Sequence, residues 1–292
     1  MTGVAVLLVV ISAFAHATWN LIAKRSTTPE LANWWMATSG AMIMLPVAIV
    51  LLIRDTPPAI GWAFIAGTIG LHIMYFFTLG RAYRYGDLSI VYPIARGLGL
   101  TLIPILGITL LGESMGLQAG FGAGLILAGI VTVGINAHSP EGSRRTLRNI
   151  LRDKGVLFAL ATGVLIGSYS VLDKQGVSHV TPVLYMFFLT TGGSLGTLAL
   201  IHRNYDRRQF VTEMQMHWRP IILGGLLQFL AYVLVLSALR LSSVSYVGPF
   251  RELAIGIGVV LGALVLKERV TRARALGATF VVLGAVTIAL AP

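Results

Sequence analysis

Three ionisable side chains lie inside long apolar segments of the sequence, where charges are rare. Arg96 is in one segment, and Arg251 and Glu252 are in another, each a few residues after a proline, Pro93 or Pro249. A charge at the centre of a bilayer helix costs about 2.5–3.5 kcal/mol by moderate scales, so such residues usually face a cavity or a partner. Because a guanidinium suits carboxylate and phosphate geometry, we predict that Arg96 and Arg251 bind an anionic group.

The two prolines are predicted to open their helices. Proline frees a backbone carbonyl one turn earlier, and such interruptions are tolerated where a helix lines a cavity. Pro93 and Pro249 are therefore candidate gating residues, and Glu252, the only acid well inside a predicted span, is the candidate proton carrier.

A structural alternative exists for the charged residues. Arg251 could pair with Glu252 or with another acid, while Arg96 could reach the membrane surface or cap carbonyls. Neighbouring residues on a helix do not face each other, so we expect Arg251 and Glu252 to point in different directions.

Further polar and aromatic side chains are predicted to line the same binding site. Amphipathic rings and amides suit a polar cavity, although they also occur in interfacial belts. His72 and Gln228 take near-equivalent places, each early in a predicted span. The predicted lining residues are Trp19, Asn20, His72, Tyr92, Gln228 and Tyr246.

The remaining notable acids are expected at the membrane surface. Glu113 and Glu268 each close a predicted span, and capping or pairing with a base is the favoured role over proton coupling. Asp173 and Lys174 end another predicted span and are expected to form a surface pair.

The sequence contains few features of an enzyme or of a metal-binding protein. The chain has no cysteine, and its six histidines are scattered. No metalloprotease, serine-hydrolase or nucleotide-binding motif is present. We therefore predict no catalytic residues, no metal site and no direct use of ATP.

Composition indicates a membrane protein. Charged residues make up 11% of the 292 residues, against about 25% in soluble domains. The net charge of +11 comes from residues in short breaks between apolar runs, which favours the positive-inside effect over nucleic-acid binding.

The fold class that we predict is an all-α integral membrane protein with ten spans. About 20 apolar residues cross a hydrocarbon core of roughly 30 Å. The predicted spans are 2–23, 32–53, 60–80, 88–111, 115–136, 155–174, 182–202, 218–240, 245–266 and 273–290.

The second half of the sequence repeats the first. Thr-Pro pairs open the second and seventh spans, and further pairs match at a constant offset. The matching pairs include Arg96 with Arg251, Glu113 with Glu268, Gly122 with Gly277, and Gly129 with Gly284. Five spans per half is an odd number, so the halves must be inverted. We predict repeats at 1–137 and 155–292, joined by a basic loop at 138–154.

Glycines in the fifth and tenth spans have small-xxx-small spacing, which allows close helix packing. This packing could occur within the chain or between two copies, so a homodimer is an open alternative.

Several motifs together resemble the drug/metabolite transporter superfamily, specifically its EamA-like family, over essentially the whole chain. They are His16-Ala17-Thr18-Trp19-Asn20 with Lys24, Tyr92-Pro93, Gly248-Pro249, Gly112-Glu113 and Lys267-Glu268. The resemblance implies a ten-helix inverted-repeat carrier that needs no cofactor. Relatives move amino acids, other metabolites, drugs, sugar phosphates and nucleotide sugars.

The expected function is therefore secondary transport of a small polar metabolite across the cell membrane by alternating access. An amino acid or a related compound, moved outward, is the first choice of substrate. An organic anion or a phosphonate is the alternative, and a membrane-embedded enzyme or receptor is the alternative class. The expected partners are this small molecule and the lipid bilayer, with no nucleic acid.

The orientation of the chain is testable with terminal fusions. Most of the 22 lysines and arginines lie after odd-numbered spans, which predicts that these breaks are cytoplasmic and both termini outside. The family resemblance implies cytoplasmic termini instead. A reporter that is active only in the cytoplasm should be silent at either terminus, and activity there would reverse the assignment.

Overall fold

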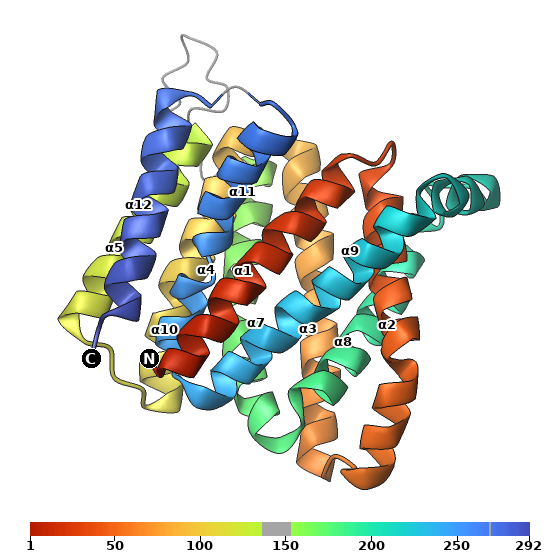
Figure 1. The fold of residues 1–292 in the computed structure, drawn as a ribbon, viewed down its shortest axis with the longest axis horizontal. Helices are drawn as coiled ribbons and strands as arrows, with labels where there is room; N and C mark the ends of the chain where they lie inside the picture. The colour runs from red at the N-terminus through yellow and green to blue at the C-terminus, as the bar shows by residue number, and fades with distance from the viewer. Residues whose placement is uncertain (136–152, 269) are drawn as a thin grey trace. The chain divides into compact units, whose positions relative to one another are not determined.

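The structure is a computed structural model that describes residues 1–135, 153–268 and 270–292 (Figure 1). Every regular element in these residues is an α-helix. The helices are α1 (Gly3–Lys24), α2 (Pro29–Arg54), α3 (Ala59–Tyr85), α4 (Leu88–Leu111), α5 (Leu117–Ile135), α7 (Lys154–His179), α8 (Pro182–Ile201), α9 (Arg207–Leu241), α10 (Val244–Phe250), α11 (Leu253–Val265) and α12 (Arg272–Ala289).

Among the described residues, nine helical segments are long and apolar enough to cross a bilayer, with α10 and α11 counted as one. α5 contains a shorter apolar stretch, Leu117–Val133. Each predicted span corresponds to one of these segments, so the all-α membrane fold class is confirmed. The predicted connecting loop 138–154 lies almost entirely outside the described residues.

Two helices begin where the Thr-Pro pairs predict a break. Thr28 precedes Pro29 at the start of α2, and Thr181 precedes Pro182 at the start of α8. Proline suits the first turn of a helix because its missing N–H would have no helical partner there.

α4 and α11 end in the same backbone arrangement. The amide of Glu113 donates to the carbonyl of Gly107 (3.1 Å), and the amide of Glu268 donates to that of Gly262 (3.2 Å). The residue before each glutamate is left-handed, with φ of 66° after α4 and 55° at Lys267. Both helices therefore end with a left-handed residue, a common helix C-cap, followed by an amide that bonds to the carbonyl six residues earlier. The two glutamates thus match in backbone geometry as well as in sequence.

The described chain divides into two compact units. Unit 1 comprises residues 1–2, 74–171 and 242–292, and unit 2 comprises residues 3–73 and 172–241. In unit 1, α5 packs against α12 and α4, and α10 packs against α4. In unit 2, α1 and α2 pack against α9, and α2 also packs against α8. Each unit therefore takes helices from both halves of the sequence.

α5 and α12 approach each other through glycines, and they lie side by side in Figure 1. A Cβ at Gly122 would lie 2.7 Å from the carbonyl oxygen of Gly284, and one at Gly129 would lie 2.6 Å from that of Gly277. The order of contacts reverses along the two helices, so they are antiparallel. The glycine spacing thus packs two helices of one chain, which is the first of its two predicted uses.

Replacing Gly122 tests this close packing. Gly122→Ala should lower the melting temperature of the detergent-purified protein, because the new methyl group would overlap rigid backbone of α12. Overpacking of this kind costs about 1–3 kcal/mol. Gly124→Ala is the matched control, since nothing lies within 4 Å of its added Cβ. It should be neutral, or stabilising by up to about 1 kcal/mol through helix propensity. Equal shifts in the two variants would contradict the glycine contact.

Candidate functional site

Glu252 lies between the two arginines that the sequence singles out. Its Oε1 atom is 3.6 Å from Nη1 of Arg96 and 3.6 Å from Nε of Arg251. α4 supplies Arg96, and the junction of α10 and α11 supplies the other two residues, all within unit 1. The side chains of Glu252, Arg251 and Arg96 are 7%, 14% and 22% exposed. Because water is largely excluded, these charges attract one another more strongly than at an open surface.

The helix of the ninth span is broken where it carries these charges. Arg251 and Glu252 separate α10 from α11. Pro249 has no N–H to continue the helical ladder. The amide of Glu252 donates to the Pro249 carbonyl (3.1 Å) and that of Ala254 to the Arg251 carbonyl (3.2 Å), each only three residues back. The backbone is thus irregular next to Pro249, although the break lies after the proline and not in the turn before it, and the gating role of Pro249 stays a prediction.

Two sequence-based predictions about local geometry are wrong. Arg251 and Glu252 do not point apart, because the prediction assumed a regular helix and the chain is irregular there. α4 runs unbroken through Pro93, so the opening predicted at that proline does not occur. Pro93 lies in the second turn of α4, so its missing N–H removes a hydrogen bond only at the very start of the helix.

Tyrosines adjoin the charged residues of unit 1. The hydroxyl of Tyr169, on α7, accepts a hydrogen bond from Nη2 of Arg251 (3.2 Å), and the side chain is buried. The ring of Tyr75 meets the Tyr169 ring edge-on, with centroids 5.8 Å apart. Tyr92 lies one helical turn before Arg96 on α4, so the two share a face. The cluster of charges and phenols can therefore bind groups of either sign.

The second carboxylate oxygen of Glu252 is unsatisfied. Oε2 is buried and has no hydrogen-bond partner among the described residues. Leaving a buried charged acceptor unpaired is costly, by about 1–3 kcal/mol or more. The cluster also carries two positive charges against one negative charge. It thus offers an acceptor for a donor group and an excess of positive charge for an anion.

Unit 2 contains a buried carboxylate that sequence reasoning missed. Asp173 of α7 is 0% exposed. Its Oδ1 accepts hydrogen bonds from the hydroxyls of Thr68 on α3 (2.6 Å) and Tyr185 on α8 (2.9 Å). Its Oδ2 accepts one from the hydroxyl of Tyr232 on α9 (2.5 Å). The carboxylate thus joins four helices through neutral donors.

The surface pair predicted for Asp173 and Lys174 is wrong. α7 continues to His179, so Asp173 lies inside the helix rather than at its end. The ammonium of Lys174 instead donates to the carbonyl of Leu239 on α9. The signal that could have corrected the boundary is Pro182, which begins the next helix and places the break after His179.

His72 belongs to the Asp173 network. Its Nδ1 lies 2.9 Å from the carbonyl oxygen of Thr68 and 3.1 Å from the Thr68 hydroxyl oxygen. A carbonyl can only accept, so we assign a hydrogen to Nδ1. The His72 ring also meets the Tyr232 ring edge-on at 6.0 Å. The structure therefore places His72 in the hydrogen-bond network of unit 2.

The other predicted lining residues are distributed over both units. In unit 2, the Gln228 amide donates to Oδ1 of Asn33 (3.3 Å), and its Oε1 is buried without a partner among the described residues. In unit 1, the buried Tyr246 hydroxyl accepts from the amide of Gly116 (3.1 Å). Tyr246 thus holds backbone in place, whereas Gln228 keeps an unsatisfied polar atom.

Trp19 and Asn20 make local contacts in unit 2. Trp19 packs against a buried apolar cluster that includes Met36 and Ile221. The exposed Asn20 amide donates to the carbonyl of His16, one turn earlier in α1. These contacts do not connect either residue to the Asp173 network.

Glu113 and Glu268 have the structural roles that the sequence favours. The Glu113 carboxylate accepts from the amides of Val244 (2.8 Å) and Ser245 (2.9 Å) and from the Ser245 hydroxyl (2.6 Å). It therefore caps the amino end of α10, where a negative charge is favourable. Glu268 pairs with Arg274 at 3.6 Å on a partly exposed surface.

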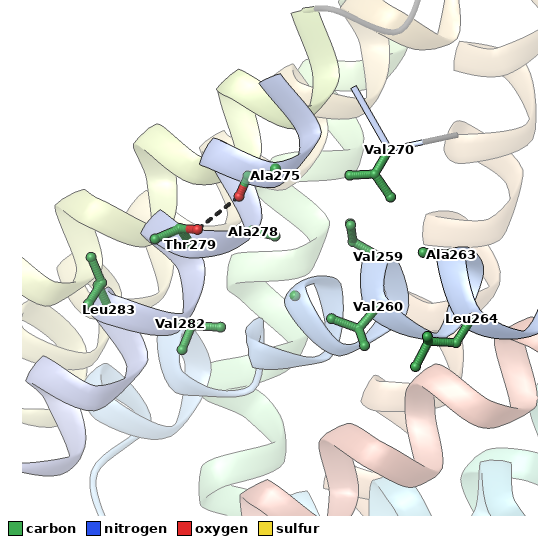
Figure 2. A pocket seen from close by; sticks show the side chains of 11 residues that line it. Val259, Val260, Ala263, Leu264, Val270, Ala275, Ala278, Thr279, Val282 and Leu283 are labelled. Atoms are coloured by element: carbon green, nitrogen blue, oxygen red, sulfur yellow. Dashed lines mark hydrogen bonds between the residues drawn. The ribbon is translucent and has the colours of Figure 1, made fainter. Parts of the chain in front are cut away.

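An apolar pocket lies between α11 and α12 (Figure 2). It has a volume of about 440 Å³ and is lined by aliphatic side chains such as Val259 and Leu283. Thr279 is its polar lining residue, and the Thr279 hydroxyl donates to the carbonyl of Ala275 in its own helix. This pocket offers little to a polar ligand, so the candidate site is the charged cluster.

The apolar helices and the charges shielded within them define a multi-pass protein of the cell membrane. The sequence profile of the EamA-like transporter family matches residues 3–135 and 153–290. The chain belongs to the EamA-like transporter family, whose members are transporters of small molecules.

Individual relatives agree with this assignment. The multidrug resistance protein EbrB of Bacillus subtilis (strain 168) is 33% identical over 82 residues, which are 28% of this chain and 70% of EbrB. A solved crystal structure of a protein has 21% sequence identity to this chain and a TM-score of 0.75, over 98% of both chains. At that identity, the likeness establishes the fold alone.

Arg96→Gln tests whether the charged cluster serves transport. A hydrogen bond to a charged group is worth about 1.5–3 kcal/mol, so transport should fall about tenfold or more. The measurement is flux in liposomes with a variant that stays folded. Arg274→Gln removes an arginine from the more exposed pair with Glu268. Such pairs contribute about 0–1 kcal/mol, so this control should transport normally. Unchanged flux in Arg96→Gln would contradict the assignment of the site.

Proposed function

We propose that the protein is a secondary carrier that exports a small zwitterionic metabolite, an amino acid or a related compound, by alternating access. The observation that carries this proposal is the buried carboxylate of Glu252. Its Oε1 faces two guanidiniums, while its Oε2 has no hydrogen-bond partner among the described residues. A ligand that carries both an anion and a hydrogen-bond donor complements this arrangement.

An amino acid would use both signs of charge in the cluster. Its carboxylate would bind Arg96 or Arg251, because a guanidinium presents paired donors that match a carboxylate. Its ammonium group would donate to Oε2 of Glu252. Each bond would replace hydration that the ligand loses on entering the shielded site. The adjoining hydroxyl of Tyr169, which already contacts Arg251, would help to orient that guanidinium.

The broken helix supports a transport role for the site. Discontinuous helices in secondary carriers place substrate sites near the middle of the membrane and expose backbone groups to the ligand. The break between α10 and α11 coincides with Arg251 and Glu252. Irregular backbone at membrane depth is tolerated where it is buried in protein or lines a cavity.

Alternating access rests on an inverted repeat, for which two features provide support. α4 and α11 end in the same backbone arrangement at matching glutamates. α5 and α12, the last helices of residues 1–137 and 155–292, cross antiparallel through matching glycines. A duplication with inverted halves accounts for both features, and rocking of related parts is the usual basis of alternating access.

Outward transport is proposed by analogy. The matched relative EbrB is named as a multidrug resistance protein, and resistance is typical of proteins that remove compounds from the cell. This analogy concerns the direction of transport and does not extend to the substrate.

The excess positive charge favours a second candidate, an organic anion carrier. Two arginines face one glutamate in unit 1, so an anion such as a carboxylate or a phosphonate would neutralise the cluster. In that case Glu252 would hold the two guanidiniums apart and would not contact the ligand.

Glu252→Gln separates the two candidates. The variant keeps the size of the side chain and removes its negative charge. If the substrate is zwitterionic, amino acids should lose about tenfold or more in affinity, because an ammonium then lacks a charged acceptor. Carboxylic acids that lack the amino group should bind as before or better. The measurement is a thermal-shift titration of the purified protein with paired amino acids and deaminated analogues.

Glu268→Gln is the matched control. It also replaces a glutamate by glutamine, but Glu268 pairs with Arg274 and does not belong to the cluster of Arg96, Arg251 and Glu252. It should preserve ligand preference. If deaminated acids stabilise the wild type and amino acids do not, the amino-acid proposal is wrong and the anion alternative is favoured. Flux in liposomes that neither saturates nor supports counterflow would contradict a carrier mechanism altogether.

A further inference from the structure

The Asp173 network of unit 2 is a buried ionisable site that the proposed substrate site does not use. Thr68, Tyr185 and Tyr232 donate hydroxyl hydrogens to the carboxylate from α3, α8 and α9. Thr68 also connects the carboxylate to Nδ1 of His72. The result is a continuous path of hydrogen bonds between two titratable groups, His72 and Asp173, on different helices.

The charged and titratable groups around Asp173 come from every helix that bonds to it. α3 contributes His72, α8 contributes Tyr185, and α9 contributes Tyr232. On α7 itself the next residue is Lys174, whose ammonium donates to the backbone of α9. Among the described residues, the hydrogen-bond partners of the carboxylate are thus three neutral hydroxyls.

This environment differs from that of Glu252. Protonation of Glu252 would discard its ion pairs with two guanidiniums, which favour the charged carboxylate. The partners of Asp173 are hydroxyls, which can donate or accept, so one of them can turn its hydrogen away and accept from the carboxyl group instead. The geometry around Asp173 therefore accommodates a hydrogen on the carboxylate without loss of a partner.

A proton fits the site better than a metal cation. Three hydroxyls direct their hydrogens at the carboxylate, so a cation that approached either oxygen would meet hydrogens of the same sign of partial charge. A proton passed from the Thr68 hydroxyl to Oδ1, with Thr68 reprotonated from Nδ1 of His72, would instead convert Oδ1 into a donor to the Thr68 oxygen. The carboxylate would then hold α3 through a reversed bond, while the bond from Tyr232 of α9 stays on Oδ2.

We propose that Asp173 is the proton-binding residue through which this carrier is coupled to a proton gradient, with Thr68 and His72 as the path for the proton. This inference rests on the proposed carrier function and assigns its coupling ion. Binding and release of the proton change the hydrogen bonds that join α7 to its neighbours, so the charge of Asp173 affects how these helices are held.

The first test reads the proton directly, without a substrate. Infrared difference spectra of the purified protein, recorded as pH is lowered, should contain the C=O stretch of a protonated carboxylic acid that Asp173→Asn lacks. Glu213→Gln is the matched control. Glu213 is also a buried acid of unit 2 and accepts from two hydroxyls, those of Ser26 and Thr27. It should keep the band, whereas a band that persists in Asp173→Asn would overturn the proposal.

The second test reads coupling in liposomes, with the amino acid that gives the largest thermal shift as the probe. A pH gradient should drive its accumulation by the wild type. Asp173→Asn should lose this accumulation and keep counterflow. Absence of counterflow in the wild type would contradict the carrier function itself. Counterflow with pH-independent accumulation, or accumulation driven by sodium, would overturn only the proton site.

If Asp173→Asn does not fold, Tyr232→Phe provides a second test, because it leaves the Asp173 carboxylate in place. Loss of one donor to the ionised form should make protonation easier, so the infrared band should appear at higher pH. A merely structural role would lower the melting temperature and leave the pH at which the band appears unchanged.

Discussion

Placing a charge among apolar helices costs about 2.5–3.5 kcal/mol even by moderate scales, and unit 1 places three charges together. Glu252 offsets this cost because one of its oxygens faces both Arg96 and Arg251. The arrangement requires the chain to leave the helix after Pro249, since a regular helix would turn adjacent side chains apart. The need to pair these buried charges therefore accounts for the broken helix and the ion pairs. Together with the unsatisfied Oε2 atom of Glu252, they form the candidate binding site.

Two buried acids of the membrane helices, Glu252 and Asp173, show how the surroundings of a carboxylate determine its chemistry. Glu252 faces guanidiniums, which stabilise its negative charge and make it an acceptor for a ligand. Asp173 faces the hydroxyls of Thr68, Tyr185 and Tyr232, each of which can donate or accept a hydrogen bond. The carboxylates therefore offer different chemistry in the two units, and substrate binding by Glu252 and proton binding by Asp173 are the roles that we propose for them.

The matched positions Glu113 and Glu268 share their backbone geometry and differ in their partners. Glu113 and Glu268 end their helices in the same motif. The first caps α10 through two amides and a hydroxyl, and the second pairs with Arg274. The backbone arrangement depends on local hydrogen bonds that each helix end makes by itself, whereas the carboxylate contacts depend on which neighbour is present.

The sequence alone determined the features that depend on composition and local pattern. Apolar length predicted the membrane helices, because each helix must satisfy its own backbone in lipid, and nine of the described helical segments are long enough to cross a bilayer. The charges of Arg96, Arg251 and Glu252 stood out because their surroundings are uncharged. Only the tertiary structure decided that Glu252 faces both arginines, that His72 joins Asp173, and that Pro93 leaves its helix intact. These outcomes depend on packing between helices distant in sequence, which no local pattern encodes.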